Sequence, residues 1–446
     1  MKELVYFCQG ESHKATNKVC QDYALCRIFD NMSVAILSDG HGGNRYFRSD
    51  IGAKLAVECT LENVKEFVNN VRDSVFEGKP FTAIDALTAE RKKSDFRKNS
   101  IADQQLHQLF ASIIFSWRTA INRYTEEHPF SEEESKVLKG TKDLDEIEKT
   151  YGCTLMCYVI TTHYWFAFHI GDGKCVIFEN TGSWKEPIPW DEQCFLNKTT
   201  SLCDRDSISE FRYCYQGDGN FPVAAFLASD GLDDSFGEIS NQANFYIQIL
   251  KCIDKSSNEE TQKEIEESLP TLSKIGSKDD MSIACLYEEQ NIHKVIPLYI
   301  KWQQTYIKSQ IDSINNRIKV LRNKQANHCS SASCEVKDKI EEDYTNKELE
   351  RLFIAKKELA NKYDNFSKEI DGEVLCPYSD EIGMEYISQS DTSINSCEST
   401  LNNVVIESDR SAPEEPVADS IVSNANDAPE VKLVEDTQNI IVKKDV

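Results

Sequence analysis

Aspartate residues lie beside glycine or another polar residue at five points where an apolar run of the sequence begins or ends. These points are Cys20–Tyr23, Ser38–Gly43, Ile170–Gly173, Ser229–Asp234 and Lys278–Ser282. One Asp-Gly pair alone predicts only a turn, because both residues are common in turns. Several carboxylates at the rims of neighbouring strands would crowd like charges, and divalent cations are the simplest relief. Because carboxylate oxygens are the ligands that Mg²⁺, Mn²⁺ and Ca²⁺ prefer, the pattern predicts a metal site.

Nucleotide loops and cysteine-ligated metal sites are not indicated. The run Gly171-Asp172-Gly173-Lys174 lacks the spacing of a P-loop, and no G-x-G-x-x-G follows a strand-like run. The 16 cysteines include no C-x-x-C pair of the kind found in zinc ribbons and redox centres. Several lie in apolar runs, where a reduced thiol behaves as a small hydrophobe. We therefore expect free thiols and a cytoplasmic location.

The charge balance argues against two classes of partner. The 446 residues include 50 Lys and Arg against 75 Asp and Glu, which gives a net charge of −25. Nucleic acids and anionic membrane surfaces both attract basic segments, so we expect neither as a partner. No apolar run reaches the roughly 18 residues of a transmembrane helix. Glu3 and the short apolar run around it argue against a signal peptide.

The elements that must position the aspartates are short strands and at least one long helix. Apolar, β-branched and aromatic runs predict strands at 33–38, 153–162, 165–170, 175–178, 222–229 and 281–287. Between Leu106 and Tyr124 apolar residues recur at helical spacing and predict an amphipathic helix. The polar segment 77–100 predicts a surface loop or insertion. Strands, then helices, then strands again favour a layered α+β domain.

Two further regions follow a predicted main domain over residues 1–290. In 291–370, apolar residues alternate spacings of four and three from Ile307 to Leu321 and later repeat by seven. This pattern is equally compatible with a helical hairpin or short coiled coil and with two amphipathic helices packed on the main domain. Residues 371–446 contain 17 acidic and 4 basic residues, a composition that predicts a disordered tail.

The aspartate motifs resemble those of the metal-dependent serine/threonine protein phosphatases of type 2C, the PPM family. Asp39–Gly43 matches the family's DGHGG motif, and Gly171–Gly173 matches its GDS or GDG turn. Ser229–Asp234 matches SDGLxD, Asp279–Ser282 matches DN(M)S, and Gly152–Leu155 resembles the GTT or GCT strand. The order of these motifs and the spacing between them also match the family, and the resemblance covers roughly residues 6–289. The resemblance implies a four-layer α-β-β-α sandwich of two antiparallel sheets flanked by helices, followed here by a C-terminal helical hairpin.

The resemblance also implies a set of ligands and a mechanism. Asp39 would bridge two Mn²⁺ or Mg²⁺ ions, with the carbonyl of Gly40 and the carboxylates of Asp230 and Asp279 completing the set. Asp172 and Asp234, with Asp230, match a third, weaker metal position. A metal-bridging hydroxide would attack phosphorus directly, and His41 is the candidate acid for the departing oxygen. Asp280 occupies a position where Asn is usual.

Two positions depart from the family pattern. Gln21 stands before Asp22 where Glu is usual; it can still hydrogen-bond a metal-bound water but brings no charge. A similar Gln-Asp form is found in a bacterial branch of the family, so the resemblance does not imply inactivity. Asn17 stands where the phosphate-gripping Arg is usual. His13, Lys14 or Lys18 could supply the positive charge, and His13 ranks first because 10–13 resembles the opening of that branch.

These observations favour a Mn²⁺- or Mg²⁺-dependent protein serine/threonine phosphatase that acts on a phosphoprotein. The alternative is a catalytically weak phosphatase-like interaction protein that presents the C-terminal helices and the acidic tail to a partner. Hydrolysis of small phosphoesters on the same scaffold is a third reading. Aspartate at each expected ligand position favours the enzyme, because a degenerate domain has no physical need to hold repelling carboxylates together.

Overall fold

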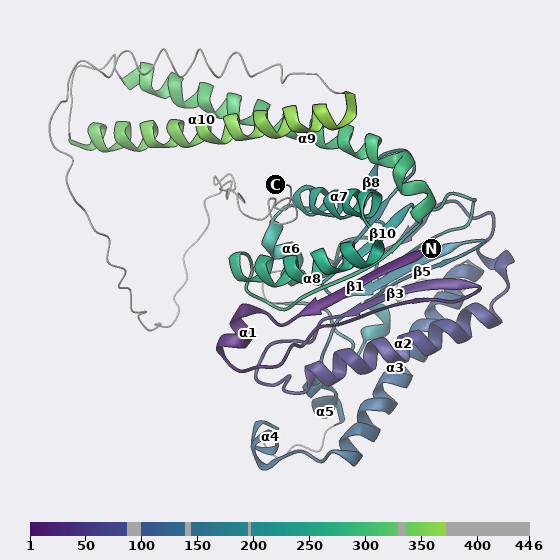
Figure 1. Cartoon of the computed structure of the whole chain (residues 1–446). Helices are drawn as coiled ribbons and strands as arrows, with labels where there is room; N and C mark the ends of the chain where they lie inside the picture. The colour runs from purple at the N-terminus through teal and green to yellow at the C-terminus, as the bar shows by residue number, and fades with distance from the viewer. Residues whose placement is uncertain (87–99, 139–143, 195–197, 329–335, 372–446) are drawn as a thin grey trace. The chain divides into compact units, whose positions relative to one another are not determined.

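Two antiparallel β-sheets form the centre of the fold (Figure 1). The computed structural model describes residues 1–86, 100–138, 144–194, 198–328 and 336–371. One sheet has the strand order β1-β11-β10-β7-β8 and the other β2-β3-β5-β6-β9-β4. The strands are β1 (Lys2–Cys8), β2 (Tyr23–Ile28), β3 (Met32–Ser38), β4 (Thr82–Ile84), β5 (Leu155–Thr161), β6 (Trp165–Ile170), β7 (Lys174–Phe178), β8 (Trp184–Lys185), β9 (Arg212–Gln216), β10 (Ala224–Ala228) and β11 (Met281–Tyr287).

Helices cover the outer faces of the sheets. Those before the last strand are α1 (Glu11–Ala15), α2 (Ser49–Asn70), α3 (Ile101–Glu127), α4 (Glu132–Val137), α5 (Leu144–Thr150), α6 (Asp230–Phe236), α7 (Ile239–Lys255) and α8 (Asn258–Ile275), with short 3₁₀ turns at Asp73–Val75 and Ser207–Ser209. The long helices α2 and α3 lie against the six-stranded sheet, and α7 and α8 against the five-stranded one (Figure 1).

Strand β3 shows how one apolar run serves two cores. All seven of its residues are buried, and successive side chains point to opposite faces. Val34 and Ile36 join the core beneath α2 and α3. Ala35 and Leu37 join the core between the two sheets. A strand covered on both faces needs a continuous apolar run instead of an alternating one, and this explains the pattern at 33–38.

Specific contacts fix the helices on the sheets. Phe110 of α3 stacks on Phe211 beside the six-stranded sheet, with ring centroids 4.5 Å apart. Tyr246 of α7 stacks on Phe226 of β10 at 4.3 Å. Helix α8 bonds the edge strand β1 directly, because the Gln262 amide donates to the carbonyl of Val5 at 2.8 Å. The predicted α+β sandwich of two antiparallel sheets flanked by helices is therefore confirmed.

The helix predicted from the apolar stripe at 106–124 is confirmed, whereas part of the predicted loop at 77–100 forms a strand. Ser100 caps α3 in a capping box with Asp103, which explains where that helix begins. Within the predicted loop, β4 pairs antiparallel with β9 at the edge of the sheet. Strand β4 has only three residues, too few for the polar and apolar alternation of a strand to be recognised among the charged residues around it. Residues 87–99 of that loop lie outside the described part of the chain.

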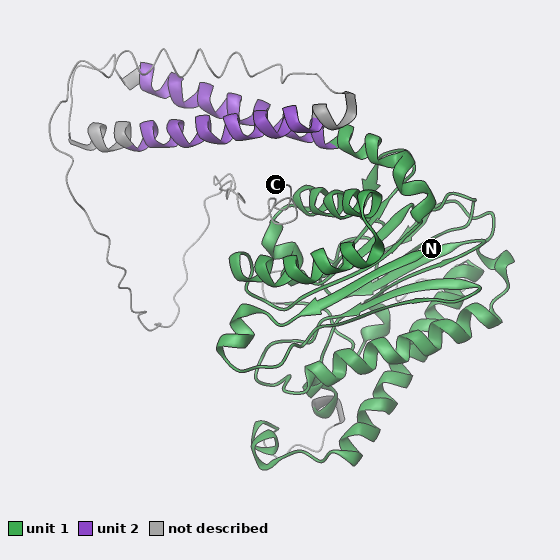
Figure 2. Cartoon of the chain, in the orientation of Figure 1, with its two compact units in different colours: residues 1–302, 434–446 green, residues 303–433 purple. Residues whose placement is uncertain are grey.

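Two long helices follow β11: α9 (Glu289–His328) and α10 (Val336–Asp371). The chain divides into two compact units, one of residues 1–302 and 434–446 and one of 303–433 (Figure 2). In the second unit, α9 and α10 pack against each other through two apolar clusters: Ile307, Ile311, Leu359, Ala360, Tyr363 and Phe366, and Ile314, Ile318, Leu321, Leu349, Leu352 and Phe353. Arg317 pairs with Glu348 at 2.8 Å on the outside of this hairpin.

The first turns of α9 belong to the first unit. Tyr299 packs edge-on against Phe178 of β7 and donates a hydrogen bond to the carbonyl of Glu179 at 2.5 Å. Trp302 meets Trp184 of β8 edge-on, with ring centroids 5.4 Å apart. Nearly the whole predicted acidic tail, residues 372–446, lies outside the described part of the chain. None of the described helices combines the length and apolar character needed to span a membrane.

Candidate metal centre

In the six-stranded sheet, two aspartates lie where neighbouring strands meet at one edge. Asp22 directly precedes β2, and Asp39 directly follows β3. Because β2 and β3 are antiparallel and Tyr23 is paired with Ser38, these two carboxyls reach the same end of the sheet. The turns at the ends of these two strands therefore also place Asp22 and Asp39 at the same edge of the sheet.

The other sheet brings three more aspartates to its own edge. Ala228, the last residue of β10, is paired with β11 on one side and β7 on the other. Asp230 follows it by two residues at the start of α6, Asp279 precedes β11, and Asp172 precedes β7. The antiparallel register thus places all three at one end of the sheet.

The two edges meet at Asp39 and Asp230, and each of these carboxyl groups shifts the pKa of the other. Burial raises the pKa of Asp39 well above its usual value, and the charges of Asp22 and Asp230 raise it further. Burial likewise raises the pKa of Asp230, with the charges of Asp279 and Asp234 contributing. Buried carboxyls of like charge are stabilised by a bound cation, which neutralises their charge.

Two more acids predicted for a third ion lie at the periphery of this pair. Burial and the charge of Asp230 raise the pKa of Asp172 to about 7. Burial and the charge of Asp279 raise the pKa of Asp234, which is less enclosed. Asp39, Asp230, Asp279, Asp172 and Asp234 are therefore linked through the effects of their charges on one another's pKa.

Contacts with the backbone hold the DGHGG loop, residues 39–43, in place. Gly40 donates its N–H to the carbonyl of Gln21 at 3.1 Å, and a Cβ at Gly40 would lie 2.7 Å from that carbonyl oxygen. Only glycine permits this close approach. Thr154 holds Asp39 twice, through its hydroxyl to the Asp39 N–H at 3.0 Å and its own N–H to the Asp39 carbonyl at 2.8 Å.

His41 lies on the same loop, partly buried beside an aromatic ring. Its N–H donates to the carbonyl of Gly152 at 3.1 Å, and Tyr46 meets the imidazole edge-on at 4.9 Å. Burial lowers the pKa of His41 to about 4, so the free protein carries this imidazole uncharged at pH 7. An acid role for His41 then requires a bound phosphate, whose negative charge would raise that pKa.

Gln21 supports the loop through its amide. Its Nε2 donates to the carbonyl of His41 at 3.1 Å and to the hydroxyl of Ser49, which itself donates to the His41 carbonyl at 2.9 Å. Its Oε1 is buried and accepts no hydrogen bond from the described residues. The amide nitrogen is thus committed to the loop, and only the amide oxygen is left for a metal-bound water.

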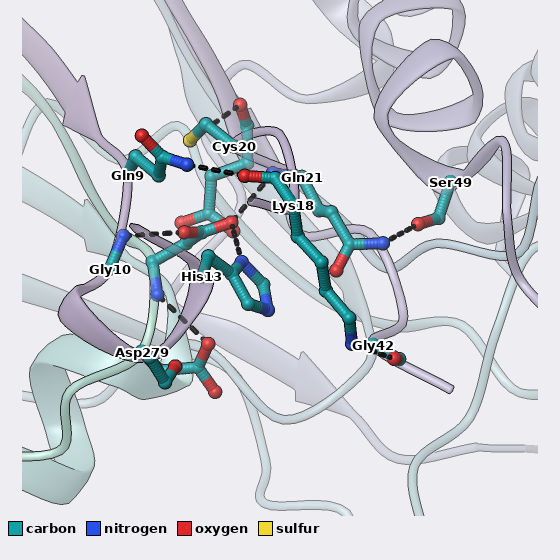
Figure 3. Close-up of polar contacts among 12 residues, drawn as sticks. Gln9, Gly10, His13, Lys18, Cys20, Gln21, Gly42, Ser49 and Asp279 are labelled. Carbon is teal, nitrogen blue, oxygen red and sulfur yellow. Dashed lines mark hydrogen bonds and ion pairs between the residues drawn. The ribbon is translucent and has the colours of Figure 1, made fainter. Parts of the chain in front are cut away.

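The segment between β1 and β2 carries the predicted phosphate-binding cations (Figure 3). Nδ1 of His13 lies 2.9 Å from Oδ2 of Asp280, and His13, Asp279 and Asp280 form a compact group with ligand atoms within 4.8 Å of one another. Lys18 reaches across and donates to the carbonyl of Gly42 at 3.1 Å. Asn17, at the position of the usual Arg, has a positive φ of 54°, a backbone conformation that Asn tolerates.

The sequence did not point to several residues that hold the site. Ser49 carries no motif of its own, whereas Thr154 lies in 152–155, the stretch that resembles the GTT or GCT strand. Behind the turn at Gly171, the Thr200 hydroxyl accepts from the Gly171 N–H at 3.0 Å and donates to Asp191 at 2.8 Å. Asp191 in turn pairs with buried Arg212 at 2.6 Å. Because these partners are distant in sequence, only the fold reveals them.

The residues present fit a divalent-metal centre. Both oxygens of buried Asp22 accept no hydrogen bond from the described residues. The charge of Asp230 also raises the pKa of Asp39, whose usual value burial already raises. All the donors are hard oxygens, as Mn²⁺ and Mg²⁺ prefer.

Sequence comparison identifies the family. A family model described as protein phosphatase 2C matches residues 9–270, more than half of the chain. The chain belongs to the protein phosphatase 2C family. The family match ends before Asp279, so the last aspartate segment lies outside it. No curated protein matches the sequence.

Several solved structures are also similar to this phosphatase 2C chain. For Stp1 from Staphylococcus aureus the identity is 13% and the TM-score 0.37, over 65% of this chain and 95% of that one. PstP/Ppp from Mycobacterium tuberculosis is 13% identical with a TM-score of 0.36, and the match covers 64% of this chain and 97% of that chain. A C. elegans sex determining protein is 16% identical with a TM-score of 0.39, and the match covers 66% of this chain and 67% of that chain. One PstP catalytic-domain structure is described as a complex with 2 manganese ions.

Proposed function

We propose that this chain hydrolyses phosphoserine and phosphothreonine in proteins and depends on Mn²⁺ or Mg²⁺. The observation that supports this most is the group of acids at the ends of the two sheets, where burial and the charges of Asp22 and Asp230 raise the pKa of Asp39. Membership of the phosphatase 2C family indicates dephosphorylation as the reaction, and the group of carboxylates is the reason to expect a metal ion.

Asp39, Asp230, Asp279 and the carbonyl of Gly40 would hold two ions, and Asp172 and Asp234 with Asp230 a third. Bound divalent ions would lower the pKa of water and neutralise charge on the phosphoryl group. Because the donors lie at the ends of strands in two packed sheets, their positions are fixed before substrate binds.

His41, His13 and Lys18 would act on the substrate itself. His41 stands on the metal-binding loop and would protonate the departing serine or threonine oxygen. His13 and Lys18 come from the segment before β2 and would contact the phosphate oxygens. Gln21 would hold the loop that carries His41 through the contacts described above.

The proposal is tested by assaying the full-length chain on a phosphoserine peptide with and without Mn²⁺. We expect Mn²⁺-dependent release of phosphate that Asp230→Asn abolishes. Asp254→Asn, a carboxylate change on α7 remote from the cluster, is the matched control and should retain activity. Absence of turnover at every Mn²⁺ and Mg²⁺ concentration, with no calorimetric binding of either metal, would falsify the enzyme reading.

A further inference from the structure

We infer that a groove at the end of the sandwich remote from the metal centre docks an acidic segment of the phosphoprotein substrate, an inference that rests on the proposed function. This docking groove has a volume of about 460 Å³. Its walls are the end of α2, the turn that follows it and the first turn of α3. The residues whose chemistry defines it are Val71, Arg72, Val75, Lys79 and Ile101.

The docking groove has a charge opposite to that of the whole chain. Arg72 and Lys79 line it, whereas no acidic residue does among the residues that the structure describes. Neither cation forms an ion pair or a side-chain hydrogen bond with a described residue. The chain as a whole has 75 acidic and 50 basic residues. Two cations that line one concave site without a carboxylate beside them create a local positive potential, which attracts carboxylate ligands.

The backbone that carries the two cations is anchored. The carbonyl of Arg72 accepts from the N–H of Val75 at 3.0 Å, and the carbonyl of Lys79 accepts from the N–H of Gly217 at 2.9 Å. Between them in the sequence, the side chain of Phe76 is fully buried in the core under α2 and α3. Because this turn is already fixed, a ligand that binds there does not need to order it.

Apolar side chains line the same groove. Ile101, the first residue of α3, is 66% exposed, which is unusual for a large aliphatic side chain. Val71 and Val75 are half-buried. These three residues would contact an aliphatic side chain, while the cations would bind carboxylates on either side of it. The ligand that fits is therefore a peptide in which acidic residues flank an aliphatic one.

Charge complementarity favours another protein's acidic segment over two other occupants. Residues 87–99, which precede α3 in the sequence and lie outside the described part of the chain, include five basic and two acidic residues. A segment of that charge is repelled by Arg72 and Lys79. An anionic membrane surface is flat and does not fill a concave site of this size.

The docking groove is separated from the metal centre by the length of α2 (Figure 1). That helix begins at Ser49, whose hydroxyl donates to the carbonyl of His41 at 2.9 Å. It ends at Asn70 near the start of β3, where Asn31 donates to Asn69 at 3.0 Å. Its 22 residues span about 33 Å. Since an extended peptide covers about 3.3–3.6 Å per residue, at least about ten residues must separate the acidic segment from the phosphorylated residue.

Synthetic substrates test this spacing in the full-length chain at saturating Mn²⁺. Each joins a phosphoserine segment to two leucines flanked by glutamates, through a Gly/Ser linker of about 4 or about 30 residues. Only the longer linker has an r.m.s. length, about 30 Å, that matches the span. We expect the long substrate to have a KM about tenfold below that of the phosphoserine segment alone, and the short one to show no gain. Equal KM values for the two would overturn the inference.

Charge reversal in the groove provides the matched comparison. Arg72→Glu with Lys79→Glu should raise the KM of the long substrate to that of the short one. Hydrolysis of p-nitrophenyl phosphate should be unchanged, because this substrate has no docking segment. The control is Lys255→Glu with Lys294→Glu, the same change in net charge at exposed positions on α7 and α9. If the control raises the KM equally, the effect belongs to the net charge and the groove is not the docking site.

Binding measured without turnover separates this inference from the proposed function. Fluorescence anisotropy of the labelled leucine–glutamate segment is recorded with the full-length chain in EDTA. We expect binding that weakens as salt rises and that Arg72→Glu with Lys79→Glu weakens at least tenfold. Such binding without turnover on any substrate would fault the proposed function alone. No binding at low salt would refute the docking groove even if catalysis is confirmed.

The same measurement identifies other occupants. Binding that appears only in a chain ending at residue 371 would show that the acidic tail of this chain occupies the groove, and would overturn the assignment to a substrate. Vesicles of phosphatidylserine and phosphatidylcholine should not bind the full-length chain. Vesicle binding that the two charge reversals abolish, without peptide binding, would likewise contradict the inference.

Discussion

Asp22 illustrates why the acidic cluster calls for cations. Its carboxyl is buried beside the hydroxyls of Ser282 and Ser229, which lower its pKa, and near the charges of Asp280 and Asp230, which raise it. Burial is the largest cause that raises its pKa, to about 8. A buried charge without a partner is costly, so the metal-free protein relieves the strain by binding protons.

Proton binding gives the metal-free chain a characteristic pH dependence. The pKa values of Asp22 and Asp172, about 8 and about 7, lie above the unfolded value near 4. Such groups stabilise the fold fully below pH 4, and this stabilisation is lost as pH rises through 7 to 8. We expect the Tm measured with a chelator to fall between pH 5 and pH 9, and less steeply in Asp22→Asn.

Divalent ions should reverse this trend. Since cations compete with protons for the same carboxylates, the rise in Tm on adding Mn²⁺ should be larger at pH 8 than at pH 6. Differential scanning calorimetry at the two pH values measures it. An equal rise at both would argue that Mn²⁺ binds elsewhere on the chain.

A second prediction at the level of single residues separates acid catalysis by His41 from a structural role. His41→Ala should slow hydrolysis of a phosphoserine peptide by about 10²–10⁴-fold, the range typical of a general acid. Hydrolysis of p-nitrophenyl phosphate should slow much less, because the nitrophenolate departs without protonation. Comparing kcat for the two substrates decides the matter, and equal losses would indicate that His41 instead maintains the loop.

At the level of elements, the site depends on how loops are supported from strand ends. The aspartates were predictable because each sits in a short motif at the end of an apolar run. The residues that hold these loops in place were not all predictable. Asp191, which pairs with Arg212 and accepts a hydrogen bond from Thr200, acts on residues far away in sequence, and no local pattern marks it. Strand β4 escaped prediction for a similar reason, since its pairing with β9 defines it.

Gln21 yields a prediction about the DGHGG loop. The family resemblance suggests that Gln21→Glu would restore the usual carboxylate. Here the amide donates to the carbonyl of His41 and to Ser49, so a carboxylate would face the carbonyl without a proton between them. We expect Gln21→Glu to lower the free energy of unfolding by about 1–3 kcal/mol. Urea unfolding measures it, and a more stable variant would show that the loop does not need this donor.

At the level of the whole molecule, the predicted boundary and the limit of the first compact unit fall at different residues. The aspartate motifs end near residue 289, and the prediction placed the boundary at 290. The compact unit continues to Trp302, because apolar residues of α9 are buried on it: Ile292, Val295, Ile296, Tyr299 and Ile300. A helix that runs through both units gives no break in periodicity, so no local pattern in the sequence marks this limit.

Two truncations distinguish these limits. A chain ending after residue 302 should keep the Tm and the activity of the first unit. A chain ending after residue 290 loses the buried face of α9 and should be less stable by several kcal/mol, since burial of each large aliphatic side chain contributes about 1.5–3 kcal/mol. Thermal unfolding of both proteins tests this. Equal stability would show that the start of α9 contributes little to the unit.

The central claim is that acids from two sheets converge on a pair of divalent ions, and diffraction tests it most directly. Crystals of the full-length chain grown with Mn²⁺ would be measured at the manganese absorption edge. The account predicts two anomalous peaks, each in contact with Asp39 and together enclosed by Asp230, Asp279 and Gly40. Peaks that avoid Asp39, or ordered Asp39 and Asp230 carboxyls with no ion beside them at saturating Mn²⁺, would contradict it.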